Sequence, residues 1–252
     1  RSVIDKANKF TIVMSGNHDE ERERHAIEAL LQRQCDALIL HSKALPDEEL
    51  LELMHCETPV VFVNRLISGA EERCVWLDNK EGTLCAVRHL VSMGHKQIAF
   101  VTSDDAEFTD AKQRFEGYRL GLEEAGIPFD AQLVTAAYAD EVGGHRAIEN
   151  LLQRNVPFTA FVGFNDAMAA GGISCLLEHG IQIPEQVSVV GFDDIPYIRF
   201  IRPKLTTVKY PIESIGEHAA ELALRLLDGK NSEDVLLKFT PEMVVRDSVK
   251  QA

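Results

Sequence analysis

Two stretches of the chain repeat one pattern: FVGFNDAMAAGG at residues 161–172 and VSVVGFDDIP at residues 187–196. Each runs a short apolar segment into Gly-Phe and then into two polar residues, Asn165-Asp166 and Asp193-Asp194. Short apolar runs of this kind predict buried β-strands. In open parallel sheets, small ligands bind outside the carboxyl ends of the strands. The repeated pattern therefore predicts an α/β fold with a binding site at the strand ends.

The same alternation of strand and helix patterns runs along almost the whole chain. The candidate strands are KFTIVMS, CDALILHS, PVVFVNR, CVWLDN, QIAFVTS, QLVTAA, FTAFVGFN, VSVVGFDD and LTTVKY, with two more inside VLLKFTPEMVVRD. Amphipathic helices lie between most of them, and Gly94, Gly126 and Gly180 are placed to end helices. Strand–helix–strand alternation predicts parallel sheets with helices on both faces. Because about ten strands is many for one open sheet, and the alternation breaks at residues 64–73, we expect two α/β lobes.

Composition narrows the class of protein. The 252 residues carry a formal net charge of −14, which disfavours direct contact with nucleic acid by this chain. No apolar run approaches a membrane span, and no signal peptide is recognisable. Five widely spaced cysteines without a CxxC pair predict buried, reduced thiols in a cytoplasmic protein. Because the chain opens on Arg1 in what reads as the tail of a helix, we expect a segment to precede it.

Polar residues at the strand ends are the candidate ligand contacts. The Asp193 carboxylate can accept hydrogen bonds from two adjacent hydroxyls, and the Asn165 amide can both donate and accept, as a polyol such as a sugar requires. Loop chemistry or helix capping would explain both residues equally well. Asp166 and Asp194 each precede a helix or a turn, so we interpret both as N-caps.

Two further candidates come from other segments. Arg114 lies near the start of a predicted helix and could clamp ring and hydroxyl oxygens with its guanidinium. On sequence alone, a solvated helix arginine paired with Glu116 or Asp110 is the favoured interpretation. Tyr138 precedes a loop and could stack on a sugar face, or it could be an ordinary aromatic residue of an edge strand.

Catalytic motifs are missing from the sequence. It has no GxGxxG, no GxxxxGK[ST] and no HExxH or HxH spacing, and Ser174 lacks the glycine pattern of a hydrolase nucleophile. We therefore expect no enzyme, no cofactor and no metal site. An enzyme with a doubly wound fold is one alternative, and the missing phosphate-binding loop and nucleophile disfavour it.

Four segments carry a resemblance to a known family: VSVVGFDDIPYIRFIRPKLTTVKYP, FTAFVGFNDAMAAGG, HLVSMGHKQIAFVTS and RFEGYRLGLEEAGI. They resemble the core of the lactose/galactose-repressor family of bacterial transcription regulators. EERERHAIEALLQRQCDALILHSKALPDEEL is most similar to the galactose repressor and isorepressor branch. The likeness runs from about Lys9 to Ser248, and its GFDD…P.LTTV signature is highly specific.

The resemblance implies two doubly wound parallel-sheet lobes, periplasmic-binding-protein-like, with a sugar in the cleft between them. One lobe would comprise residues 1–78 plus 209–239, and the other residues 79–208 plus 240–252. Family positions for the inducer fall on five residues of this sequence, which are Arg114, Asn165, Asp193, Tyr138 and Asn64. His41 ends the neighbouring strand and would lie in the outer shell of ligand contacts. The ligand implied is galactose or a related monosaccharide.

The family also implies partners. Its members work as homodimers, and the loop PYIRFIRP and helix Ala169 to Leu176 match its dimer contacts. A helix-turn-helix head, a hinge helix and a first strand precede the point that matches Arg1 in those proteins, so operator DNA would be bound only through a head that this chain lacks. The rival class is a periplasmic sugar-binding protein of a transport system, which would carry a leader peptide instead of the head.

Overall fold

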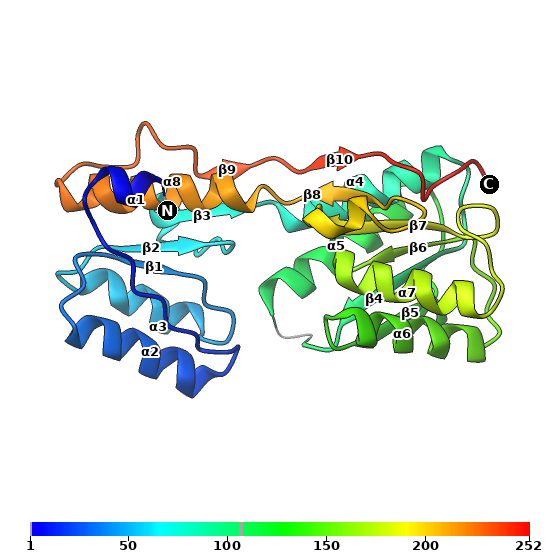
Figure 1. The fold of residues 1–252 in the computed structure, drawn as a ribbon, viewed down its shortest axis with the longest axis horizontal. Helices are drawn as coiled ribbons and strands as arrows, with labels where there is room; N and C mark the ends of the chain where they lie inside the picture. Colours follow the sequence, from blue (N-terminus) through cyan, green and yellow to red (C-terminus); the bar gives the residue numbers. More distant parts are fainter. Residues whose placement is uncertain (1, 106–107) are drawn as a thin grey trace. The chain divides into compact units, whose positions relative to one another are not determined.

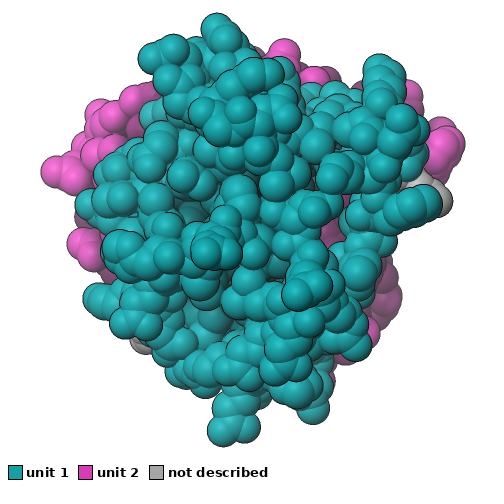
Figure 2. Space-filling model, turned by 90° about the vertical axis from the view of Figure 1, so that its left-hand side faces the viewer, with its two compact units in different colours: residues 1–77, 211–239 teal, residues 78–210, 240–252 magenta. Residues whose placement is uncertain are grey.

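The computed structural model describes residues 2–105 and 108–252, which form two compact units (Figure 1). Unit 1 comprises Arg1–Leu77 with Pro211–Phe239, and unit 2 comprises Asp78–Tyr210 with Thr240–Ala252. Figure 2 colours the two units separately. Arg1, at which the sequence predicted a helix tail, lies outside the described residues. The chain thus passes from one unit to the other three times.

Unit 1 is built on a parallel four-stranded sheet. Its order is β1 (Leu38–Leu40), β2 (Val60–Val63), β3 (Cys74–Leu77) and β9 (Lys238–Phe239), and every neighbouring pair runs parallel. The helices are α1 (Ser2–Lys6), α2 (Glu20–Gln32), α3 (Asp47–Glu52) and α8 (Ile212–Leu227), with 3₁₀ turns η1 (Leu53–His55) and η2 (Glu71–Arg73). Side chains of α2 and α3 share one core cluster with Val60 and Phe62, while α8 packs on the sheet as well.

Unit 2 has a six-stranded sheet of order β10-β8-β7-β6-β4-β5. The strands are β4 (Ile98–Ser103), β5 (Val134–Ala137), β6 (Ala160–Gly163), β7 (Ser188–Asp193), β8 (Thr206–Lys209) and β10 (Glu242–Val244). All pairs are parallel except β10 with β8. The helices are α4 (Asn79–Ser92), α5 (Thr109–Glu124), α6 (Glu141–Gln153) and α7 (Asp166–Glu178), with η3 (Ala131–Leu133) and η4 (Pro196–Arg199).

The helices of unit 2 cover both faces of its sheet, as the alternation of side chains along β4 shows. Ala99 and Val101 belong to the core cluster formed with α6 and α7. Phe100, one residue between them, stacks on Tyr118 of α5 with ring centroids 4.9 Å apart. Because successive side chains of a strand point to opposite faces, α4 and α5 cover one face while α6 and α7 cover the other (Figure 1). This arrangement confirms the predicted doubly wound α/β architecture.

Two of the sequence expectations about the fold are wrong. KFTIVMS forms no strand and pairs with no other strand among the described residues, and the Phe10 side chain is fully exposed. A strand pattern becomes a strand only when a neighbour satisfies its backbone hydrogen bonds. All five cysteines are free thiols, but only Cys74 and Cys175 are buried, whereas Cys56 is exposed. The three glycines expected to end helices do so, since Gly94, Gly126 and Gly180 all have positive φ.

Helices α6 and α7, which carry part of the site described below, approach each other unusually closely. A Cβ atom placed on Gly171 of α7 would lie 1.9 Å from the Glu141 carbonyl oxygen of α6. A Cβ on Gly144 of α6 would lie 2.1 Å from the Met168 carbonyl oxygen of α7. Backbone atoms cannot swing aside as a side chain can, so these glycines set the spacing of the two helices.

Gly171→Ala is therefore expected to destabilise the protein by about 1–3 kcal/mol, because the added methyl group forces the helices apart. Gly216→Ala is the matched control, since Gly216 lies inside α8 and a Cβ there meets nothing within 4 Å. That control should gain about 0.5–1 kcal/mol from its higher helix propensity. Urea unfolding of both variants checks the prediction, and equal midpoints would contradict it.

Candidate functional site

Four polar or aromatic residues collect at the carboxyl edge of the unit 2 sheet. Tyr138 follows β5, Asn165 follows β6 after Phe164, Asp193 is the last residue of β7, and Tyr210 follows β8. These four strands run parallel, so their carboxyl ends meet at the same edge of the sheet. This is the edge at which open α/β sheets bind small ligands.

Arg114 of α5 contacts this edge through Phe164 and Asp193 and is 4% exposed. Its Nε donates to Asn79 Oδ1 at 3.0 Å, and its Nη1 donates to the Phe164 carbonyl oxygen at 2.5 Å. The guanidinium lies over the rings of Phe192 and Phe164, with 3.7 Å and 4.6 Å from its carbon to the two centroids. The solvated arginine favoured on sequence alone is therefore wrong, because this side chain is fixed in a buried aromatic and polar cage.

Asp193 faces Arg114 from the end of β7. Its Oδ1 lies 3.6 Å from Arg114 Nη2, which is an ion pair longer than a hydrogen bond, and its side chain is 27% exposed. Its φ of 116° lies in a region that residues other than glycine rarely adopt. Strained backbone of this kind clusters at functional sites. The arrangement leaves a partly exposed carboxylate beside a buried cation.

Both the oxygen and the nitrogen of the Asn165 side-chain amide form hydrogen bonds. Its Oδ1 accepts from the Met168 backbone N–H at 2.7 Å, which makes it the N-cap of α7, and its Nδ2 donates to the Ala139 carbonyl oxygen at 3.0 Å. The interpretation of Asp166 as the cap is therefore wrong, since Asp166 is the first residue inside the helix and fully buried. Asp194 does not cap η4 either, because Ile195 holds that position and Asp194 pairs with Arg246 and Arg199 instead.

Tyr138 presents an exposed ring, 65% accessible, directly after β5. It lies one residue before Ala139, the acceptor of the Asn165 amide. Four of the predicted contacts therefore lie in unit 2 and are linked to one another. Arg114 donates to the Phe164 carbonyl oxygen, and Phe164 is followed directly by Asn165. Asp193 in turn pairs with Arg114.

The other two predicted contacts belong to unit 1. Asn64 follows β2 and His41 follows β1, two adjacent parallel strands. The Asn64 side-chain oxygen is buried without a hydrogen-bond partner among the described residues, and Asn64 has a φ of 57°. Burying a polar atom without a partner costs free energy. Such an atom marks a place where a ligand hydroxyl or a water molecule would be stabilised. His41 is exposed.

Sequence reasoning missed two residues beside Arg114. Asn79, the first residue of α4, is 1% exposed and holds the guanidinium by its Nε. Tyr210 donates its backbone N–H to the Asp193 carbonyl oxygen at 3.2 Å. Burial raises the pKa of its phenol, and the nearby Asp193 and Asp110 carboxylates raise it further, against the opposing effect of Arg114. Tyr210 follows β8 as Asn165 follows β6, and that position was the signal available in the sequence.

Neither a metal site nor a membrane segment is apparent in residues 2–105 and 108–252. No group of three or more histidine, cysteine, aspartate or glutamate side chains there could hold a metal ion. In the same ranges, no helix has the length and apolar character needed to cross a bilayer.

Comparison with known proteins agrees with this architecture. Each unit is an α/β layer structure built on a sheet of mainly parallel strands, and residues 87–249 match the family of periplasmic binding protein-like domains. The transcriptional regulator GalR of Escherichia coli K12 is 42% identical over 240 residues, which cover 95% of this chain and 70% of the relative. The chain belongs to the lactose/galactose-repressor family of transcription regulators, and it forms the effector-binding core.

Solved structures support the same assignment. A sugar-binding transcriptional regulator of the LacI family from Escherichia coli, complexed with phosphate, has a TM-score of 0.90 at 30% identity and covers 98% of this chain and 89% of its own. A LacI-family regulator from Enterococcus faecium with bound ribose has a TM-score of 0.85 at 26% identity, covering 100% and 91%. These relatives favour a transcription regulator over a periplasmic transport component.

Proposed function

We propose that this chain binds galactose or a related monosaccharide and thereby controls the DNA affinity of a transcriptional repressor. The observation that carries the proposal is the Arg114–Asp193 pair, a partly exposed carboxylate beside a buried guanidinium at the carboxyl ends of parallel strands. One similar structure is described as a sugar-binding regulator and another holds bound ribose, which supports this class of ligand.

Each residue has a role that follows from its chemistry. The Asp193 carboxylate accepts hydrogen bonds from two adjacent hydroxyls. Arg114 has five N–H donors, and its Nη2 group, which points to Asp193, donates to a hydroxyl or ring oxygen. The Asn165 amide has a second hydrogen and a second lone pair beyond those that bind Ala139 and Met168. The exposed ring of Tyr138 stacks on the apolar face of the sugar.

The proposal keeps the two lobes that the family resemblance implies, residues 1–78 plus 209–239 and residues 79–208 plus 240–252, and assigns ligand contacts to each. Asn64 supplies its buried side-chain oxygen from the first lobe, and His41 lies in the outer shell of contacts. A ligand that binds one lobe arrangement better than another shifts the population toward it, by no more than the difference between its two affinities.

The readout requires a second copy and a DNA-binding segment. We propose a cytoplasmic homodimer that contacts its partner through the loop PYIRFIRP and through residues 169–176 of α7. Operator DNA is bound by a helix-turn-helix head outside this chain, because a net charge of −14 disfavours phosphate contacts by the core.

A thermal-shift screen with galactose, fucose, glucose, fructose and ribose tests the proposal. A sugar that binds only the folded protein stabilises it, by about 2.7 kcal/mol at a concentration of 100 times its Kd. We expect galactose or fucose to give the largest shift. No shift with any of the five sugars would overturn the assignment of the ligand class.

Asp193→Ala is expected to weaken galactose binding roughly tenfold to hundredfold or more, because hydrogen bonds to a charged acceptor are lost. Asp247→Ala is the matched control, since Asp247 is an exposed aspartate of the same unit. Isothermal titration calorimetry measures both variants. Unchanged affinity in Asp193→Ala would remove this residue from the site.

A further inference from the structure

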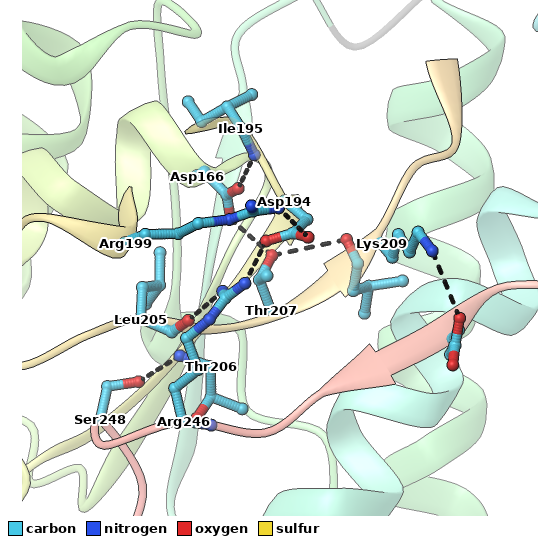
Figure 3. A network of polar contacts seen from close by, with 12 residues as sticks. Asp166, Asp194, Ile195, Arg199, Leu205, Thr206, Thr207, Lys209, Arg246 and Ser248 are labelled. Carbon is cyan, nitrogen blue, oxygen red and sulfur yellow. Dashed lines mark hydrogen bonds and ion pairs between the residues drawn. The ribbon is translucent and has the colours of Figure 1, made fainter. Parts of the chain in front are cut away.

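Asp166 is a carboxylate buried beneath the ligand residues, and the proposed binding of sugar does not use it directly. It is 0% exposed at the first position of α7. Its Oδ1 accepts from the Thr207 hydroxyl at 2.5 Å, and its Oδ2 accepts from the Ile195 backbone N–H at 2.9 Å. Figure 3 shows that Asp166 thereby joins α7, the turn after β7 and strand β8.

The turn that Asp166 contacts is strained. Asp193 and Asp194 have φ values of 116° and 57°, so two consecutive residues other than glycine adopt positive φ. Such residues are energetically unfavourable and persist only where their surroundings hold them. Ile195 follows the strained pair directly, and its N–H is the group that Asp166 fixes. Within the pair, the Asp193 carbonyl oxygen accepts from the Tyr210 N–H.

The second aspartate of the turn is held from another direction. Asp194 pairs with Arg246 of the C-terminal segment and, at 3.2 Å, with Arg199 of η4 (Figure 3). Arg246 also donates to the Leu205 carbonyl oxygen at 2.7 Å. Asp194 is therefore anchored away from Arg114, which leaves Asp193 as the carboxylate that faces the site.

Space around Asp166 is reserved by a glycine on the neighbouring strand. A Cβ atom on Gly191 of β7 would lie 2.2 Å from Asp166 Oδ1 and 2.8 Å from a methyl carbon of Leu205. No side chain fits at position 191 while Asp166 holds Thr207. The buried carboxylate and the bare strand are thus parts of one arrangement.

We propose that Asp166 and Thr207 are positioning residues for the effector, which hold the turn at residues 193–195 in the conformation that lets Asp193 bind sugar hydroxyls. The ligand in this inference comes from the proposed function. That Asp166 fixes the turn is independent of the proposed function. Neither residue contacts the sugar; both act through Ile195 and the backbone of Asp193.

The chemistry of the pair identifies a conservative replacement. Burial raises the pKa of Asp166 to about 7, and the nearby Asp193 and Asp194 charges add to the rise. A protonated carboxyl keeps both contacts, because one oxygen still accepts from Ile195 while its O–H donates to Thr207. An asparagine amide reproduces that pattern, with its oxygen toward Ile195 and its NH₂ toward Thr207. Alanine at position 166 reproduces neither contact.

Four variants test the proposal. Asp166→Ala and Thr207→Val remove the hydrogen bond between residues 166 and 207, Asp166→Asn keeps it, and Ser188→Ala is the control. Ser188 is a buried hydroxyl at the opposite end of β7, where it contacts His95 and Lys250. Titration calorimetry with D-galactose, well below each thermal midpoint, gives the affinities. Hydrogen exchange of peptides covering residues 189–198 reports the turn without any ligand.

We expect Asp166→Ala and Thr207→Val to lose roughly tenfold or more in galactose affinity and to exchange their turn amides roughly tenfold faster. Asp166→Asn should match the parent in both, and Ser188→Ala should lose stability but keep affinity. Unaltered turn exchange in Asp166→Ala would overturn the inference, as would equal affinity losses in Ser188→Ala and Thr207→Val. If the parent binds none of the five sugars, the proposed function fails, and the exchange rates still decide whether Asp166 holds the turn.

Discussion

Arg114→Ala is expected to cost about 3–5 kcal/mol of stability and to reduce galactose affinity roughly hundredfold or more. Arg114 is 4% exposed, and its removal leaves the Asn79 oxygen, the Phe164 carbonyl oxygen and the Asp193 carboxylate without their cation. The Phe192 and Phe164 rings also lose the guanidinium that lies over both. One substitution thus creates a cavity and removes a hydrogen-bond donor and a cation from the groups around it.

Two further variants make this expectation sharp. Arg114→Lys keeps the charge but not the planar fork, so it should restore part of the stability and little of the affinity. Arg119→Ala removes an exposed arginine from the same helix, one that lies over the Phe129 ring, and it should change stability by less than about 1 kcal/mol. Urea unfolding and titration calorimetry measure all three. Equal midpoints for Arg114→Ala and Arg119→Ala would contradict the buried-cage interpretation.

The second large effect is a dependence of stability on pH that comes from Asp166. Its pKa rises from an ordinary value of 3.8 to about 7, first because it is buried and then because Asp193 and Asp194 repel its charge. The Thr207 hydroxyl and the Ile195 N–H oppose the rise by stabilising the carboxylate. A group whose pKa is higher in the folded state stabilises the fold fully below its unfolded pKa, and this stabilisation disappears as pH rises through the folded pKa.

The parent protein should therefore lose stability relative to Asp166→Asn as pH rises from about 4 to about 8. A difference of roughly three pKa units corresponds to at most about 4 kcal/mol. Urea unfolding of both proteins across this range gives the difference directly, because other titrating groups cancel. Thr207→Val removes a donor to the carboxylate and so raises the folded-state pKa further, which should extend the loss to higher pH. A parent-minus-variant difference that stays constant would refute the shifted pKa.

Much of the fold follows from patterns that extend over only a few residues. The strands of unit 2 and the glycines that end its helices were predictable. Apolar runs, and glycines that adopt a left-handed conformation after a helix, are both local features of the sequence. The failure of KFTIVMS has the opposite cause. Whether an apolar run becomes a strand depends on a neighbouring backbone, and no local signal reports that neighbour.

The site shows the same limit. Asp193 and Asn165 were recognisable because each ends a strand, and Tyr210 ends one too but lacked the duplicated motif that drew attention to the others. The burial of Arg114 was unpredictable from its own helix, since its cage comes from Phe192, Phe164 and Asn79 on other elements. The capping role went to Asn165 rather than Asp166 because the helix begins one residue earlier than we inferred.

Unit 2 finishes with residues that return from unit 1 at the very end of the chain. Ser248 donates to the Val189 carbonyl oxygen at 2.6 Å, Arg246 pairs with Asp194, and the Ala252 N–H donates to the Met93 carbonyl oxygen. A chimera that exchanges ligand preference with another regulator must therefore transplant two separate gene segments, because residues 78–210 alone omit the arginine that anchors Asp194.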